Sequence, residues 1–259
     1  MANYPLLLQS NHLPAVGVLQ KLLNSGGARL TADGNFGHRT RQAVIDFQRP
    51  RSLKPDGKVG VATWPRISAA ADLPILDCID ILDPLLVGDT EAPIRSVGGK
   101  PRVIGGMCNG VAQAVAMILA ASPGNVFLLR FHGHGASGDA SVSTGQGELD
   151  PSTQERGDIW NDPGIIHTLG RLAPIFGPYG CVQFMHCQTG RGSQGRLLLS
   201  TIASALGVPA TAAVHDQSGL GDGNLPFGFT GPTVTAVPGG KSLAHWARNL
   251  PEFAGISMP

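Results

Sequence analysis

A short motif occurs twice near the N-terminus of this chain of 259 residues. Segments 33–40 and 56–63 both read D-G-x-apolar-G-x-x-T, with an offset of 23 positions. Asp-Gly is typical of a tight turn, because the Asp side chain bonds to the nearby backbone and Gly accepts a positive φ. Apolar residues recur at helical spacing over 18–23 and over 39–49. The repeat therefore predicts a small all-α module in residues 1–70, with two short helices held by two tight turns.

The charge of the chain changes near residue 70. Residues 1–70 hold nine Lys or Arg and three acidic residues, a net charge of +6, whereas residues 71–259 carry −5. This shift predicts a boundary between two domains, 1–70 and 71–259, with different surfaces. The overall charge of +1 indicates no general attraction to nucleic acid or to an anionic membrane. With 14% charged and 42% hydrophobic residues, the composition also excludes a disordered chain.

The repeat region resembles the peptidoglycan-binding module of bacterial cell-wall hydrolases. The matching stretches are Leu19-Gln20, DGNFGHRTRQAVIDFQ and DGKVGVATW, and together they cover about residues 13–67. One departure is the segment 49–51, Arg-Pro-Arg, which we expect to shorten the second helix. The resemblance implies that the module binds peptidoglycan. A basic surface suits a wall polymer that carries carboxylates and phosphates.

Beyond residue 70, short apolar runs alternate with helical patterns. We expect strands near 74–82, 126–131, 182–185 and 210–214, and helices near 109–121, 165–173 and 195–206. This alternation predicts an α/β sandwich with a largely parallel sheet. In such sheets, functional groups gather at the carboxyl ends of the strands.

Two of these strands run directly into polar turns that contain glycine. The strand near 126–131 is followed by HGHG at 132–135, and the strand near 182–185 is followed by HCQTG at 186–190. Because neighbouring parallel strands lie only about 4.8 Å apart, a His and a Cys at two such ends can approach each other. A Cys near a helix start, with a His close by, is suited to nucleophilic catalysis.

An apolar strand ending in His-Gly, followed later by one ending in Cys, resembles the caspase, metacaspase and gingipain group of cysteine peptidases. The resemblance covers roughly residues 74–214 and implies a caspase-like fold. It implies Cys187 as the nucleophile, His134 as the base, and the amides of Gly135 and Cys187 as oxyanion donors. His132 is the competing candidate for the base. Met185 and His186 precede the Cys where the family often has an acidic residue, and no specificity pocket is recognisable.

Other polar and thiol side chains have expected places around this pair. His186 either orients the site or packs beside it. Asp216, with His215, follows the strand near 210–214 at the same edge, where it would orient a His or line the substrate cleft. The remaining thiols are expected to be structural: Cys78 and Cys108 in the core, and Cys181 at the start of its strand.

Two other functions stay open at the level of sequence. His132-x6-Asp139 resembles the first zinc motif of D-alanyl-D-alanine peptidases, which also carry peptidoglycan-binding modules. That resemblance implies His132 and Asp139 as zinc ligands, with His215 or His245 as a third, although the second motif of the family does not occur downstream. The chain could instead be a non-enzymatic adaptor that binds the cell wall, with both clusters structural.

The sequence as a whole predicts a peptidoglycan hydrolase, an amidase or endopeptidase that cleaves an amide bond of the wall peptide without a cofactor. We expect no nucleic-acid partner and no membrane insertion, since no run of about 18 apolar residues occurs. The N-terminus also lacks a signal-peptide pattern. We therefore expect another export route to the periplasm or cell wall, as for a secreted antibacterial toxin with a cognate immunity protein, or for a phage lysis enzyme.

Overall fold

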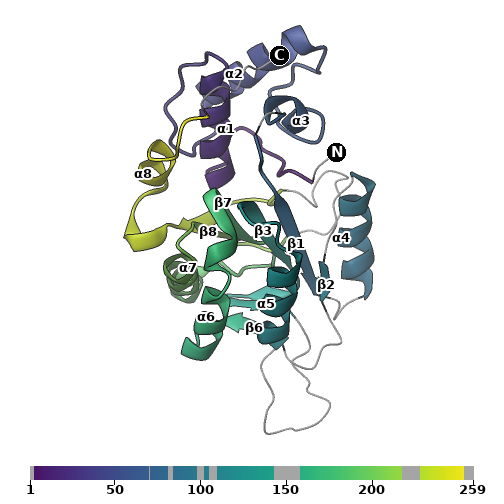
Figure 1. The fold of residues 1–259 in the computed structure, drawn as a ribbon, viewed down its shortest axis with the longest axis vertical. Helices are drawn as coiled ribbons and strands as arrows, with labels where there is room; N and C mark the ends of the chain where they lie inside the picture. Colours follow the sequence, from purple (N-terminus) through teal and green to yellow (C-terminus); the bar gives the residue numbers. More distant parts are fainter. Residues whose placement is uncertain are drawn as a thin grey trace, which may run out of the picture.

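The computed structural model describes residues 3–69, 71–80, 84–97, 102–104, 110–142, 158–217 and 228–253. Figure 1 shows a helical N-terminal region at one end of the molecule and a sheet with helices packed on it at the other. The C-terminal helix returns to the N-terminal region.

The N-terminal region contains the expected helices. The two expected helices are α1 (Pro14–Ser25) and α2 (His38–Gln48), which is followed by the 3-10 turn η1 (Arg49–Arg51). A third and short helix is α3 (Trp64–Ile67). The second helix ends at Gln48, directly before Arg-Pro-Arg, as we expected from the proline. The helix α3 was not indicated by apolar spacing, because a single turn is too short to show a period.

The first copy of the repeat is a turn wrapped around a buried glutamine, Gln20. Its side-chain oxygen accepts hydrogen bonds from the amides of Asp33 and Gly34, at 2.9 and 3.0 Å. Its side-chain nitrogen donates to the carbonyl of Asn35 and to the hydroxyl of Thr40, at 3.0 and 3.1 Å. Gly34 has a φ of 75°, which glycine adopts without strain. The motif therefore encodes a turn with its buried polar groups satisfied.

The second copy repeats this arrangement around Gln48. The side-chain oxygen of Gln48 accepts from the amide of Gly57 at 3.0 Å. Its nitrogen donates to the carbonyl of Lys58 at 2.8 Å and to the hydroxyl of Thr63 at 3.1 Å. Both glutamines are 1% exposed. The repeated Asp-Gly and Thr positions of the two copies thus have the same structural role, which is to bond to a buried glutamine.

A six-stranded mixed sheet forms the centre of the remaining chain. Its order is β2-β1-β3-β7-β8-β9. The strands are β1 (Ile75–Asp80), β2 (Arg102–Ile104), β3 (Val126–His132), β7 (Phe176–Phe184), β8 (Ala210–Ala213) and β9 (Thr233–Ala236). All neighbours are parallel except β8 and β9, which are antiparallel. The expected α/β architecture with a mostly parallel sheet is confirmed.

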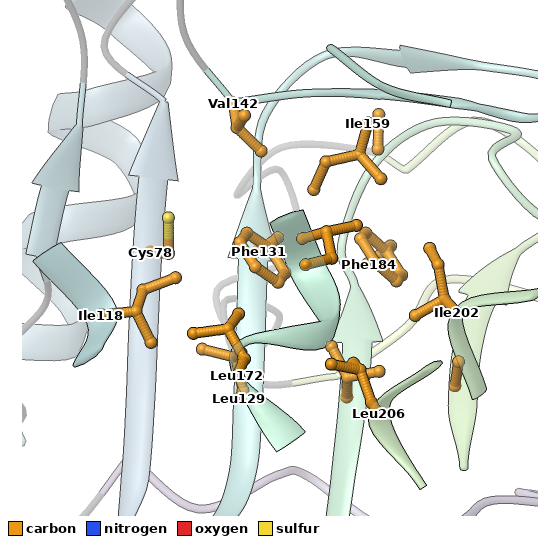
Figure 2. Packing of buried hydrophobic residues seen from close by; sticks show 14 of the residues in the cluster. Cys78, Ile118, Leu129, Phe131, Val142, Ile159, Leu172, Phe184, Ile202 and Leu206 are labelled. Carbon is orange, nitrogen blue, oxygen red and sulfur yellow. The ribbon is translucent and has the colours of Figure 1, made fainter. Parts of the chain in front are cut away.

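Helices cover both faces of this sheet. One face packs against α5 (Gly110–Ala121), α6 (Pro163–Gly170) and α7 (Gly192–Leu206), which lie in front of the sheet in Figure 1. On the opposite face Ile79 packs against Ile94 of α4 (Pro84–Ser96), since successive residues of a strand point to opposite sides. Figure 2 shows the first core, where the rings of Phe131 and Phe184 stack with centroids 5.3 Å apart.

A small antiparallel sheet follows the end of β3. It consists of β4 (Gly135–Ala136), β5 (Asp139–Ser141) and β6 (Asp158–Trp160). Ile159 of β6 lies beside Phe131 and Phe184 in Figure 2 and belongs to the same core. This core anchors the small sheet at the carboxyl edge of the large one.

The two regions of the chain are in extensive contact. The C-terminal helix α8 (Leu243–Arg248) packs on α1, where a Cβ on Gly17 would lie 2.8 Å from that of Ala247. Lys21 of α1 forms an ion pair with Glu252. Trp64 of α3 contacts Phe127 of β3, with ring centroids 6.3 Å apart. A boundary near residue 70 therefore stays a prediction, and the segment from α8 to Glu252 packs with the helical region.

Candidate functional site

Three neighbouring parallel strands bring their carboxyl ends to one edge of the sheet. They are β3, β7 and β8, and they are followed by segments 133–135, 185–188 and 215–217. The ladder continues past the end of β7, where the amide of Met185 donates to the carbonyl of Phe131 at 2.8 Å. The HGHG turn and the cysteine turn are therefore adjacent, as we predicted from their positions after two apolar strands.

Close approach between these turns explains the two glycines of HGHG. A Cβ on Gly133 would lie 2.7 Å from Nε2 of His186. A Cβ on Gly135 would lie 2.7 Å from Cβ of His186 and 2.6 Å from Oγ1 of Thr189. Distances below 3.0 Å do not occur for such atoms without displacement. The turns after β3 and β7 are thus packed together as one unit.

Cys187 lies half-buried on the turn after β7. Its sulfur accepts a hydrogen bond from the amide of Gln217 at 3.3 Å and lies 3.8 Å from the carbonyl oxygen of the same residue. Nothing in the sequence indicated Gln217, because its contact with Cys187 comes from backbone atoms of the segment after β8. This segment covers one side of the thiol.

His134 is exposed at the edge of the site. Its backbone is held in place, since its carbonyl accepts a hydrogen bond from the amide of Ser141 at 2.9 Å. The antiparallel pairing of Gly135 with Ala140 holds the next residue. The imidazole is therefore presented from a well-supported turn next to the one that carries Cys187.

His132, the competing base, points away from this turn. It is 5% exposed, and its Nε2 lies 2.9 Å from a carboxylate oxygen of Asp77. Burial lowers the pKa of His132, so the ring is neutral at pH 7. Because His132 is buried against Asp77 whereas His134 is exposed, His134 is the more accessible of the two rings.

Asp77 is the centre of a buried polar cluster. It pairs with Arg130 at 2.7 and 3.1 Å, and it accepts a hydrogen bond from the side chain of Asn3. Arg130 also donates to the carbonyl of Asn3 at 2.7 Å. Burial acts to raise the pKa of Asp77, but the charge of Arg130 and the bond to His132 hold it below its usual value. The N-terminal segment at Asn3 therefore contacts the sheet at the carboxylate of Asp77, which is paired with Arg130.

His186 lies fully buried beneath the HGHG turn. Its Nε2 donates to the carbonyl oxygen of Ser141 at 2.7 Å, and Ser141 also holds His134 through its amide. Burial lowers the pKa of His186 to about 3, so its ring is neutral at pH 7. His186 thus packs under the HGHG turn, and its buried ring is not accessible to a substrate.

Asp216 faces the cysteine turn. Its carboxylate accepts a hydrogen bond from the side chain of Gln188 at 2.7 Å, and Gln188 in turn accepts from Arg191 at 2.8 Å. Gln188 adopts a φ of 54°, an uncommon value for a residue with a side chain. Asp216 therefore restrains the residue after Cys187, and its expected contact with a His or with the substrate cleft stays a prediction.

The proposed zinc ligands do not come together. Among the described residues no three His, Cys, Asp or Glu side chains form a group able to hold a metal ion. His132 is turned toward Asp77, and His245 lies on α8, which packs against α1. In this structure His132 and Asp139 therefore do not form a group of ligands with His215 or His245.

The other cysteines are structural where they are described. Cys78 is 1% and Cys181 0% exposed, and burial raises the pKa of Cys181 to about 12. Cys181 lies well inside β7, which begins at Phe176, so the expectation that it starts the strand was wrong. The early part of the strand, FGPYG, contains two glycines and a proline that mask its strand character. Cys108 lies outside the described residues.

Two acidic residues of β1 were not recognised from the sequence. Asp77 holds Arg130 and His132, and Asp80 accepts a hydrogen bond from the hydroxyl of Ser141 at 2.8 Å. The available signal was the strand ILDCID itself, in which acidic residues interrupt an apolar run. Carboxylates in a buried strand require partners.

Comparison with known proteins identifies the helical region. Residues 12–67 match the family described as putative peptidoglycan binding domain. These residues form a peptidoglycan-binding domain. The match supports an association of the chain with the cell wall and does not extend to the sheet region.

Two individual proteins are similar to part of the chain. An uncharacterized protein in the bpoA1 3' region of Kitasatospora aureofaciens is 42% identical over 65 residues, which cover 24% of this chain and 55% of that protein. A peptidoglycan-binding protein from Clostridioides difficile, solved in complex with glutamine hydroxamate, is 29% identical over 28% of this chain and 46% of its own, with a TM-score of 0.26. The chain thus spans about half the length of each protein that it matches.

None of the helices within the described ranges is long and apolar enough to cross a membrane.

Proposed function

We propose that this protein is a peptidoglycan hydrolase in which Cys187 and His134 cleave an amide bond of the wall peptide. The observation that supports this most directly is the adjacency of the HGHG turn and the cysteine turn at the ends of neighbouring parallel strands. A mostly parallel sheet with a His and a Cys at adjoining strand ends agrees with a caspase-like fold. The peptidoglycan-binding domain indicates the substrate.

The proposed reaction has two stages. In the first, His134 takes the proton of the Cys187 thiol, and the sulfur attacks the carbonyl carbon of the amide. The C–N bond breaks, the leaving amine takes the proton from His134, and a thioester remains on Cys187. In the second, water attacks the thioester with His134 as base, releasing a carboxylate and restoring the thiol. The amides of Gly135 and Cys187 would stabilise the oxyanion in both stages.

Several neighbours would hold this pair in place. His186 joins the two turns through Ser141, whose amide holds His134. Gln188, restrained by Asp216, follows the nucleophile directly. The backbone of Gln217 lies against the sulfur, so a substrate would approach from the opposite side. These contacts would hold Cys187 and His134 in a defined geometry, although both residues lie on loops.

The peptidoglycan-binding domain would hold the Cys187 site close to the wall peptide. A tethered site acts at a high effective concentration of wall peptide, so a modest intrinsic affinity is sufficient. A secreted antibacterial toxin with an immunity protein over the Cys187 site, acting in the periplasm or at the cell wall, remains part of this proposal. Toxicity on periplasmic expression, relieved by co-expression of a protein that binds the site, would test that part.

The direct test is digestion of purified peptidoglycan with mass spectrometry of the released fragments. The intact chain should release fragments with a new amine and a new carboxylate. Cys187→Ala and His134→Ala should each lower the rate by about 10³-fold or more, while His167→Ala, a change of an exposed histidine on α6, should leave it unchanged.

Three results would contradict the proposal. Full activity in Cys187→Ala would exclude the cysteine mechanism. Loss of activity in EDTA, with no effect of iodoacetamide, would favour a zinc peptidase. Binding of wall sacculi by the intact chain without any released fragment would leave the adaptor function.

A further inference from the structure

The peptidoglycan-binding domain contains an open cleft of about 550 Å³. It lies between the end of α1, the loop 26–30 and α2. In Figure 1 these elements are at the end of the molecule opposite to α6 and β6, which lie toward the carboxyl edge of the sheet. The cleft is therefore separate from the Cys187 site.

The rim of the cleft is strongly basic. Arg29, Arg39 and Arg51 line it together with a single carboxylate, that of Asp46. Asp46 is already engaged by Arg49 at 3.3 Å and by Gln42 at 2.9 Å. Arg29 and Arg39 are exposed and form no ion pair within the described ranges. The cleft thus presents the guanidinium groups of Arg29 and Arg39 to an anion.

The floor of the cleft is apolar and carries an ordered arginine. Leu23, Ala43 and Phe47 contribute to it. The guanidinium of Arg51 lies 4.1 Å from the centre of the Phe47 ring and donates to the carbonyl of Phe47 at 3.1 Å. Because Arg51 is held in this position before any ligand arrives, little rotamer freedom remains to be lost on binding. The site suits a ligand that combines carboxylates with short aliphatic groups.

We propose that this cleft binds the stem peptide of peptidoglycan through its carboxylates. The stem peptide is the part of the wall polymer that combines carboxylates with small apolar side chains, whereas the glycan offers mainly hydroxyl and acetamido groups. This inference rests on the peptidoglycan-binding half of the proposed function and is independent of hydrolysis. The domain would hold one stem peptide while the Cys187 site cleaves another, because the two sites lie at opposite ends of the molecule.

The test measures binding by the full chain carrying Cys187→Ala, so that no probe is consumed. The probe is the disaccharide tetrapeptide released from peptidoglycan by a muramidase, and its affinity is measured by calorimetry. The double variant Arg29→Glu with Arg39→Glu should bind it at least about 10-fold more weakly. The matched control, Lys54→Glu with Lys58→Glu, changes the net charge of the same domain equally at exposed positions outside the cleft, and should change the affinity by less than about 2-fold.

Two further probes test the chemistry of the ligand. The same muropeptide with its carboxylates converted to amides should bind as weakly to the unmodified cleft as the native probe binds to the double variant. Glycan strands stripped of their peptides should not bind measurably. Unchanged thermal midpoints would show that both double variants are folded.

Different results would overturn the inference. Equal losses in the cleft and control variants would indicate a diffuse basic surface. Tight binding of peptide-free glycan, or unchanged affinity in the Arg29 and Arg39 variant, would exclude the cleft as a stem-peptide site. Fragment release by the chain with Cys187 intact is measured in parallel, so a failure of hydrolysis with binding retained would count against the enzyme and leave the cleft assignment standing.

Discussion

The two regions of this protein satisfy their buried polar groups over very different sequence distances. In the peptidoglycan-binding domain Gln20 and Gln48 bond to turns that lie 8 to 20 positions away. In the sheet region Asp77 bonds to Arg130 at a separation of 53 positions, and His186 bonds to Ser141 at 45. Arg130 reaches Asn3 across 127 positions.

This difference separates a local motif from an assembled site. A turn closed by nearby residues has a low entropic cost of loop closure and can be encoded as a short repeat. A cluster drawn from several strands exists only when the sheet has formed its order and register. Substitutions in the binding domain should therefore disturb a single turn, whereas those in the sheet region should disturb contacts between strands. The variants below test that contrast.

The largest effect is expected for Asp77→Ala. It leaves the guanidinium of Arg130, which is 0% exposed, without its carboxylate. Breaking a buried pair from one side costs about 3–5 kcal/mol of unfolding free energy, which urea denaturation would measure. A loss below about 1 kcal/mol would mean that the long-range cluster contributes little to stability.

The two repeat glutamines should be next. Gln20→Ala and Gln48→Ala each leave buried turn amides without an acceptor, at a cost of about 1–3 kcal/mol. Gln20 accepts from the amides of Asp33 and Gly34, whereas Gln48 accepts from that of Gly57, so the loss in Gln20→Ala should be at least as large as that in Gln48→Ala. Gln42→Ala, which removes an exposed side chain, is the matched control and should cost much less. A large loss of unfolding free energy in only one of the two variants would show that the two copies of the repeat are not equivalent in stability.

His186 should make stability depend on pH. Its pKa is lowered to about 3 by burial, so below pH 6.5 the unfolded chain binds a proton that the folded chain excludes. The stabilising contribution is complete above pH 6.5 and is lost as the pH falls toward about 3, by up to about 1.4 kcal/mol per pH unit. His186→Gln, which keeps a donor for Ser141 and cannot titrate, should remove this part of the slope.

Comparison of the two pH profiles isolates this residue. His132 also has a lowered pKa and acts in the same direction, but it is present in both proteins. Unfolding free energies measured from pH 7 to pH 5 should fall less steeply in His186→Gln. Identical slopes of unfolding free energy against pH would show that His186 becomes protonated in the folded state over this range, as it does in the unfolded chain.

The smallest effect is expected at the surface of the binding domain. Asp46→Ala removes an ion pair with Arg49, in which the side chains are 58% and 64% exposed. Exposed pairs contribute less than about 1 kcal/mol, so the midpoint of unfolding should barely move. A loss of unfolding free energy comparable to that of Asp77→Ala would contradict the contrast between the binding domain and the sheet region.

Local signals were sufficient for much of the fold. The helix ending before Arg49-Pro50-Arg51, the apolar strand β3 and the helix α7 were each predicted close to their observed bounds. The strand β7 was predicted too short, because FGPYG does not look like a strand. The helix α4 contains Pro93, and α8 has only six residues. Neither has a clear apolar period.

The sequence by itself determined the two Asp-Gly turns and placed a His and a Cys after two apolar strands. Such features depend on neighbouring residues and on the direction in which a strand ends. Only the tertiary structure decided that β3 and β7 are adjacent, that His132 faces Asp77 while His134 is exposed, and that Gln217 lies against Cys187. These contacts depend on strand order, on register and on the face that each side chain takes, and a shift of one residue reverses that face.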